Sequence, residues 1–339
     1  MRIKGITYDT GFISAGTTTR EPFDLEVVKR EMEIIRHDLH CNAVRLTGGY
    51  PDRLEIAAGF AGDAGLEIWF SPFTNELTLD QLLEVTGDCA ERAERLRQRG
   101  ATVVLVMGAE LSLFSAGFVP GATYIERLNA LQTPGPQRAE LIVNMRRRIN
   151  EFLGCAAALV RERFGGKVTY ASIAFEGVDW TPFDFISVDC YRTREIAAQF
   201  RAGIRALVAQ DKPVAITECG CVTFRGASEK GARGGMIVQY GEDGRAKQLD
   251  ADDYIRDEDE QAAEIVDLVE IFREEGVDSV FVNTFGSYFL PHREEPRDDL
   301  DLASAGIVKI LEHKRGKAYP EMPWEPKVAF TALSECYGS

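Results

Sequence analysis

The 339-residue sequence lacks several features that would each point to a class of protein. It has no run of roughly 20 apolar residues, so we expect no membrane-spanning helix. Its start has no apolar segment of about 7–15 residues, so we expect no signal peptide and a cytoplasmic location. The seven cysteines are an odd number without regular spacing, which argues against a disulfide framework and for reduced thiols. Basic residues are also scarce, since the chain has 39 Lys and Arg but 54 Asp and Glu. The resulting net charge of −15 argues against nucleic acid or an anionic membrane as partner.

Motifs for cofactors, metals and nucleophilic serine or cysteine are also missing. His37 and His40 form H-x-x-H, but no third metal ligand is evident. Cys219-Gly-Cys221 is not C-x-x-C, and no histidine stands in a context that marks it as a thiolate partner. There is no G-x-S-x-G, no Walker loop and no G-x-G-x-x-G after the first strand. We therefore expect neither a cofactor nor a metal.

Short apolar runs alternate along the chain with longer amphipathic ones, which is typical of parallel strands joined by helices. Eight strands are predicted: Ile3–Tyr8, Ala43–Leu46, Glu67–Ser71, Thr102–Met107, Val168–Ser172, Phe185–Asp189, Val214–Thr217 and Ser279–Asn283. Helices are predicted at Leu25–Leu39, Asp52–Ala64, Leu79–Arg99, Gln137–Phe164, Glu195–Ala209, Glu258–Glu275 and Ala303–His313. The pattern predicts an α/β fold, a (β/α)₈ TIM barrel that forms a single domain over residues 1–339. An open doubly wound sheet is the alternative, but the Gly-rich fingerprint it would need is absent.

Two long segments interrupt this alternation, each after a strand. Leu111–Pro136 follows the fourth strand, and Cys219–Asp257 follows the seventh. The middle of the second segment predicts a β-hairpin that turns at Glu242-Asp-Gly244. Because loops after barrel strands lie at the same end of the barrel, we expect both to overhang one mouth, with the hairpin over the active site.

A glutamate stands at the end of each of these two strands. Glu110 follows Thr102–Met107, and Glu218 follows Pro213-Val-Ala-Ile-Thr217. A carboxylate directly after a buried strand costs free energy unless it is solvated, paired or used in chemistry. Strands four and seven lie nearly opposite each other in an eight-stranded barrel, so the two acids can face one another. Retaining glycosidases use two carboxyl groups about 5–5.5 Å apart, one as acid and base and one as nucleophile.

The placement of these two glutamates resembles that in clan A of the glycoside hydrolases. Members of this clan are (β/α)₈ enzymes with one glutamate after strand four and another after strand seven. Pro213-Val-Ala-Ile-Thr-Glu218-Cys-Gly220 is similar to the seventh-strand motif of the clan. Asn42-Ala-Val-Arg45 is similar to the second-strand segment, and the segment Asp184-Phe-Ile-Ser-Val-Asp-Cys-Tyr191 is similar to the sixth strand. The resemblance implies that Glu110 is the acid/base, that Glu218 is the nucleophile, and that Arg45 and Tyr191 orient the nucleophile.

The sequence departs from the clan at two places. The clan has Asn before the acid/base, where it binds the sugar 2-hydroxyl, but here Ala109 precedes Glu110. The eighth strand of the clan supplies a Trp beneath the sugar, whereas Val282-Asn-Thr-Phe-Gly offers Phe285. The substrate is then not a standard pyranoside, or another residue handles its 2-position.

Other side chains near strand ends are candidates for substrate binding. Arg45 next to Glu218 would keep that carboxylate ionised. Tyr8 and Asp9 close the first strand, and Trp69 and Phe285 are apolar candidates for a sugar platform. The remaining candidates near strand ends are Glu176, Asp189 and Asn283.

The sequence therefore predicts a metal-independent retaining O-glycoside hydrolase that acts on a small or aglycone-bearing glycoside by double displacement. An acid/base lyase or isomerase on a sugar-like metabolite is the enzymatic alternative. A non-catalytic barrel that serves as a binding protein is the alternative from another class. The oligomeric state is left open.

Overall fold

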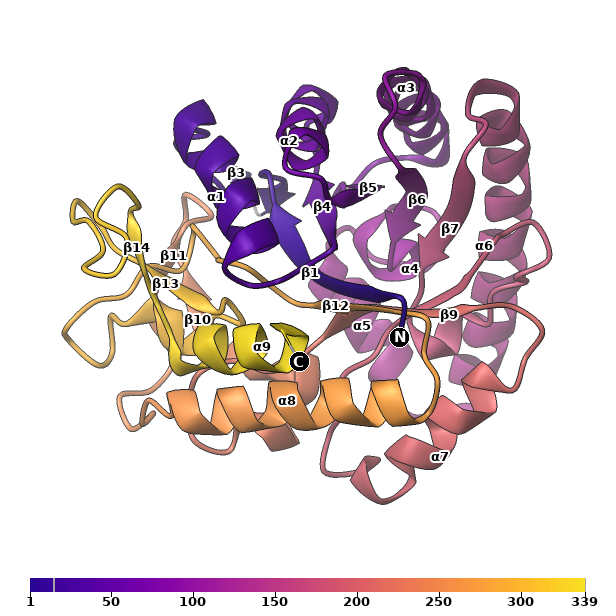
Figure 1. The fold of residues 1–339 in the computed structure, drawn as a ribbon. Helices are drawn as coiled ribbons and strands as arrows, with labels where there is room; N and C mark the ends of the chain where they lie inside the picture. The colour runs from indigo at the N-terminus through magenta and orange to yellow at the C-terminus, as the bar shows by residue number, and fades with distance from the viewer. Residues whose placement is uncertain (15, 339) are drawn as a thin grey trace.

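A barrel of eight parallel strands forms the centre of the protein (Figure 1). The computed structural model describes residues 1–14 and 16–338. The hydrogen-bonded order is β7-β6-β5-β4-β1-β12-β9-β8, and a parallel bridge between Ser172 and Val188 joins the two ends. The barrel strands are β1 (Ile3–Asp9), β4 (Ala43–Gly48), β5 (Glu67–Pro72), β6 (Val103–Ala109), β7 (Lys167–Ala171), β8 (Ile186–Asp189), β9 (Val214–Cys219) and β12 (Ser279–Val282). The predicted (β/α)₈ fold and all eight predicted strands are confirmed.

Helices surround the barrel and begin at capping residues that the sequence supplies. Asp24 caps α1, Thr78 and Gln81 form a capping box on α3, and Asp257 caps α8. Six of the predicted helices are present with ends shifted by one or two residues: α1 (Leu25–His37), α2 (Pro51–Asp63), α3 (Leu79–Gln98), α6 (Pro136–Arg163), α7 (Ala197–Val208) and α8 (Glu258–Glu274). None of the helices in the described residues has the length and hydrophobicity that crossing a bilayer requires.

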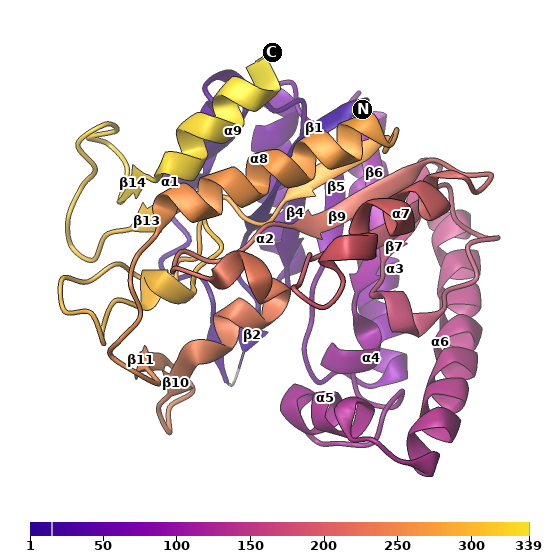
Figure 2. The ribbon, with the colours of Figure 1, turned by 90° about the horizontal axis from the view of Figure 1, so that it is seen from below.

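The predicted helix at Ala303–His313 is wrong. A 3-10 turn, η4 (Leu300–Ala303), ends there, and β13 (Val308–Ile310) pairs antiparallel with β14 (Trp324–Pro326). In β13 a half-buried Lys309 stands between two buried apolar residues, which is the alternation of a strand. The position after the eighth barrel strand is taken instead by α9 (Val328–Gly338), which lies beside α8 (Figures 1 and 2).

The loops after β6 and β9 carry secondary structure of their own. The first contains α4 (Leu111–Phe114) and α5 (Tyr124–Gln132). The second contains the short turns η2 (Ala227–Glu229) and η3 (Gly231–Ile237), followed by an antiparallel hairpin of β10 (Val238–Tyr240) and β11 (Ala246–Leu249). After β1, a small hairpin joins β2 (Ile13–Ser14) to β3 (Thr17–Thr18). Between β7 and β8 there is only η1 (Ala174–Glu176).

The barrel interior changes from apolar to polar along its axis. At one end it is filled by buried apolar side chains, namely Ile3, Ala43, Trp69, Val104, Val106, Phe185, Ala215 and Phe281. Further along the strands the buried residues are polar, namely Thr7, Arg45, Ser71, Thr169, Ser187 and Thr217. The apolar end closes the barrel, and the polar layer supports the side chains at the opposite, C-terminal end.

A buried glutamate ties α1 to three distant parts of the chain. Glu31 in α1 accepts hydrogen bonds from the hydroxyls of Tyr8 and Tyr288 and, at 2.8 Å, from the indole of Trp324. The guanidinium of Arg20 lies 2.7 Å from the same carboxylate, and both side chains are essentially fully buried. Breaking a buried ion pair leaves a charge without a partner, so we expect this contact to contribute strongly to the stability of the fold.

We expect Glu31→Ala to lower the free energy of unfolding by about 3–5 kcal/mol, because Arg20 would be left buried without its carboxylate. Urea unfolding followed by circular dichroism measures the change. Glu151→Ala is the control, since Glu151 forms an exposed pair with Arg147 in α6 and should lose less than about 1 kcal/mol. Equal losses in the two variants would contradict the importance of the buried pair.

Candidate active site

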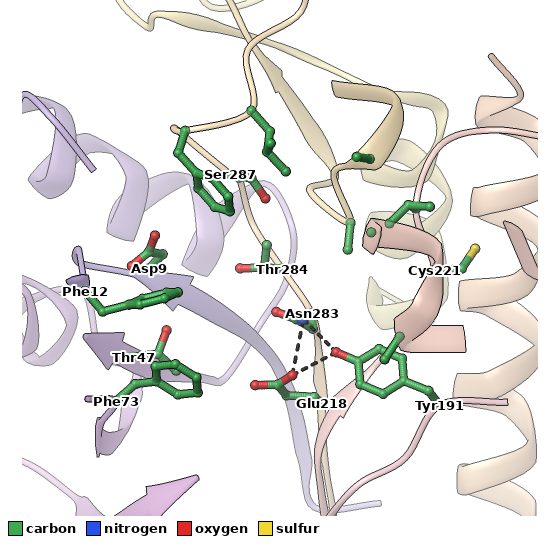
Figure 3. Close-up of a pocket in the computed structure, with 18 of the residues that line it drawn as sticks. Asp9, Phe12, Thr47, Phe73, Tyr191, Glu218, Cys221, Asn283, Thr284 and Ser287 are labelled. Atoms are coloured by element: carbon green, nitrogen blue, oxygen red, sulfur yellow. Dashed lines mark hydrogen bonds between the residues drawn. The ribbon is translucent and has the colours of Figure 1, made fainter. Parts of the chain in front are cut away.

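Glu218, near the end of β9, is held by three hydrogen-bond donors. Arg45 Nη1 lies 2.9 Å from Glu218 Oε1, and the hydroxyl of Tyr191 donates to Oε2 at 2.8 Å. The side-chain amide of Asn283 donates to Oε2 at 3.3 Å and to the Tyr191 hydroxyl at 2.7 Å (Figure 3). Arg45 is fully buried and is fixed by Ser71 and by the carbonyl of Thr217. The carboxylate is therefore fixed in position and lies next to a positive charge.

Both strands that lead to the two glutamates contain one extra residue. In β9, Val188 and Asp189 of β8 pair with Ile216 and Glu218, so Thr217 is additional. In β6 the register shifts in the same way between Val106 and Ala109. Such bulges bend a strand and redirect the following side chains, and they are common next to active sites.

Glu110 occupies a strained backbone position directly after β6. Its φ and ψ angles of 46° and 41° are left-handed, which is rare for a residue with a side chain. The next two residues are tied down: the amide of Leu111 donates to the Tyr170 hydroxyl at 2.8 Å, and the amide and hydroxyl of Ser112 donate to Glu176 at 3.1 and 2.7 Å. Tyr170 also donates to Glu176. Strain of this kind persists only where the surroundings impose it, and Glu176 anchors the segment that imposes it.

Three carboxyl groups meet at this end of the barrel. One oxygen each of Glu110, Asp189 and Glu218 lies within 4.8 Å of the other two. Burial and the neighbouring Asp189 and Glu218 raise the pKa of Glu110 well above its ordinary value. Burial and the nearby Glu218 raise the pKa of Asp189 to about 7, although Arg45, 3.7 Å away, opposes the rise. The spacing would also admit a cation, but the guanidinium of Arg45 already supplies positive charge, and we assign no metal there.

A cavity of about 340 Å³ opens above these carboxyl groups. Its polar residues are Asp9, Thr47, Glu110, Tyr191, Glu218, Asn283, Thr284 and Ser287. Its apolar and small residues are Phe12, Phe73, Phe114, Cys221, Val222, Gly231, Ala232, Gly235, Gly286, Phe289, Leu290, Ala303 and Ala305, and Tyr240 joins them from the β10–β11 hairpin. Figure 3 shows Phe12 and Phe73 on one side of Glu218 and Tyr191 on the other. Volume and lining are those of a small-molecule site.

The structure brings together seven of the eleven residues that the sequence singled out. Glu110, Glu218, Tyr191, Asp9 and Asn283 line the cavity, while Arg45 and Asp189 lie buried against Glu218. Asp9 accepts a hydrogen bond from the amide of Gly11 at 2.7 Å, and burial raises its pKa.

The other four do not line the cavity, and these expectations are corrected. Tyr8 points outward to Glu31, because alternate residues of β1 face opposite sides of the barrel wall. Phe285 packs against Tyr8 and Trp324 with ring centroids 6.0 and 5.4 Å away. Trp69 belongs to the apolar interior, against Phe185 and Phe281. Glu176 is fully buried beneath the loop after β6.

Several residues of the cavity were not singled out from the sequence. Thr47 and Phe12 were recognisable in principle, since Thr47 lies two residues after Arg45 on the same face of β4 and Phe12 follows the first strand. Ser287, Phe289 and Leu290 follow β12 in a segment without regular structure, and no pattern of the sequence marks them.

Comparisons with known proteins reveal a shared fold. No protein-family model matches the sequence, and no curated protein matches it. Among solved structures, a GH113 β-1,4-mannanase is similar with a TM-score of 0.62 and 15% identity, over 100% of both chains. A β-glucuronidase from Parabacteroides merdae has a TM-score of 0.58 and 14% identity, over 99% of this chain and 36% of its own. A β-glucosidase has a TM-score of 0.55 and 12% identity, over 100% of this chain and 98% of its own. At these identities the likeness establishes the barrel fold.

The raised pKa of Asp189 makes stability depend on pH. The folded chain holds this proton up to about pH 7, whereas an unfolded Asp ionises near about pH 4. The resulting stabilisation is complete below about pH 4 and is lost as the pH rises through about 7. We expect wild type to lose about 2–4 kcal/mol of unfolding free energy relative to Asp189→Asn between pH 4 and pH 8.

Urea midpoints of the two proteins across this range measure the difference. Asp252→Asn is the control, because Asp252 is exposed and its variant should follow the wild-type pH dependence. A gap between wild type and Asp189→Asn that does not change with pH would contradict the assignment.

Proposed function

We propose that the protein is a retaining O-glycoside hydrolase in which Glu218 is the nucleophile and Glu110 the acid/base. The observation that carries this proposal is the distance between the two glutamates, whose nearest carboxyl oxygens lie within 4.8 Å at the mouth of the barrel. Retaining enzymes separate their carboxyl groups by about 5–5.5 Å, whereas inverting enzymes need about 6.5–9.5 Å to admit a water molecule. The short distance favours direct attack by one of the carboxylates.

The environment of Glu218 suits a nucleophile. Arg45 and Tyr191 occupy one oxygen each, so the carboxyl group is oriented and held next to a positive charge. In the first step one oxygen of Glu218 forms an ester bond with the anomeric carbon as the bond to the leaving oxygen breaks.

The environment of Glu110 suits the acid. Its raised pKa favours the protonated form of the carboxyl group, and that proton goes to the leaving oxygen in the first step. In the second step the Glu110 carboxylate takes a proton from water, the water oxygen attaches to the anomeric carbon, and Glu218 is released.

Ala109 bears on the choice of substrate and on the alternative function. It is buried among the apolar residues of the barrel interior, so it offers no hydrogen bond to a sugar hydroxyl. A small or aglycone-bearing glycoside remains our proposal, as the cavity of about 340 Å³ supports. An acid/base lyase or isomerase on a sugar-like metabolite is the second candidate, favoured by the same residue.

The seven free cysteines support a reducing, cytoplasmic location.

Activated aryl glycosides of several sugars test the two roles. Glu218→Gln should abolish turnover of whichever glycoside the wild type cleaves, because no ester can form, while circular dichroism shows an intact fold. Glu110→Ala should lose less on 2,4-dinitrophenyl glycosides than on poorer leaving groups, which need protonation.

Azide should partly restore the Glu110→Ala rate, since an anionic nucleophile needs no base to attack the glycosyl ester. The product should be a glycosyl azide with the configuration of the substrate. Full activity of Glu218→Gln would refute the nucleophile assignment, and a wild type that cleaves no glycoside would favour the lyase or isomerase.

A further inference from the structure

Four aromatic rings from three loops, those after β1, β5 and β6, form a continuous row beside the cavity. Ring centroids are 4.7 Å apart for Phe12 and Phe73, 4.9 Å for Phe73 and Phe114, and 5.7 Å for Phe114 and Tyr124. We call these four residues the aromatic row. The first three line the cavity, and all four are partly exposed. Their rings are therefore not fully buried in the core and are accessible to a ligand. Figure 3 shows the rings of Phe12 and Phe73 facing the space above Glu218.

The row adjoins the proposed acid. Phe114 ends α4, the helix that begins directly after Glu110, and its amide donates to the Glu110 carbonyl at 3.1 Å. The acid must reach the oxygen that joins the sugar to the leaving group. A leaving group therefore lies on the Glu110 side of the anomeric carbon, next to Phe114 and the rest of the row.

The rest of the cavity lining is also largely apolar. Its side chains come from the segments after β9 and β12, namely Val222, Ala232, Phe289, Leu290, Ala303 and Ala305. The polar groups that could bind hydroxyls, such as Thr47 and Asn283, lie near Glu218 at the base. A flat apolar ring suits this lining, because burying it against apolar side chains removes apolar surface from water.

The charges around the cavity disfavour anionic substrates. Among the described residues that line it there is no lysine, arginine or histidine, whereas Asp9, Glu110 and Glu218 are acidic. Arg45 is buried and already contacts Glu218 and Asp189. A carboxylate or phosphate on the sugar would find no free cation in the cavity.

From these observations we propose that the site takes an uncharged glycoside whose leaving group is an aromatic ring, seated on the row Phe12–Phe73–Phe114–Tyr124. This inference rests on the proposed glycosidase function and defines its substrate class. The row is then a binding subsite for the leaving group, and the polar base of the cavity holds the sugar.

The test compares an aryl glycoside with the glycosyl fluoride of the same sugar, whose leaving group has no ring. In Phe114→Leu the ratio of kcat/KM for the aryl glycoside to kcat/KM for the fluoride should fall about three- to tenfold, as expected for loss of one aromatic contact. Phe118→Leu is the control, because Phe118 lies in the same loop but packs in the core against Phe152. Its ratio should stay at the wild-type value.

An unchanged ratio in Phe114→Leu would overturn the inference, since the row would then hold the sugar or nothing. An equal fall in Phe118→Leu would also overturn it, because the effect would be general packing. The uronide of the preferred sugar should react at least tenfold more slowly than the uncharged glycoside, and an equal or faster rate would refute the charge argument.

Binding of 4-nitrophenol, measured by calorimetry, needs no turnover and separates this inference from the proposed function. Wild type and Phe118→Leu should bind it at least threefold more tightly than Phe114→Leu. If this holds while no glycoside or fluoride reacts, the glycosidase proposal is wrong and the aromatic subsite stands. If 4-nitrophenol binds all three proteins equally, the aromatic subsite is wrong even where glycosides are cleaved.

Discussion

Negative charge confined at the mouth of the barrel is the constraint on which the site depends. Glu110, Asp189 and Glu218 converge within 4.8 Å, and Arg45 forms ion pairs with Asp189 and Glu218. All three cannot remain ionised at so short a distance without a large electrostatic cost, so protons are retained on Glu110 and Asp189. In the polar layer beneath, Ser71 and the carbonyl of Thr217 fix Arg45, which places a positive charge next to Glu218.

Much of this was visible in the sequence because a parallel barrel imposes two simple rules. Its strands are buried on both faces, so they read as short apolar runs, and all eight were found. Their C-terminal ends meet at one mouth, so an acid after such a run is directed to the same place, as Glu110 and Glu218 are. Arg45 and Asp189 followed from the same rules and from the resemblance of their segments to a known clan.

The parts that escaped prediction depend on single-residue detail. Tyr8 faces outward and its neighbour Asp9 faces inward, because side chains alternate across a strand. Selecting every polar residue near a strand end, without regard to this alternation, cannot distinguish Tyr8 from Asp9. The extra residues in β6 and β9 reset this alternation, and nothing in the runs Thr102–Met107 or Pro213–Thr217 marks them. The segment Ala303–His313 was predicted as a helix, but β13 within it pairs with β14, which the local sequence pattern does not reveal. Such pairing is a tertiary effect.

The weakest seam of the barrel lies between β7 and β8. A single bridge, Ser172 to Val188, joins them, and their backbone hydrogen bonds run from Asp184 to Val168, from Ser172 to Ser187 and from Asp189 to Ser172. By contrast, β4 and β5 pair over six residues. Local opening starts where the fewest contacts must break, so amide protons along this seam exchange with solvent before those of the other ladders. Since Asp189 ends one of the two strands, we expect such an opening to admit water to the buried carboxyl groups through the wall of the barrel.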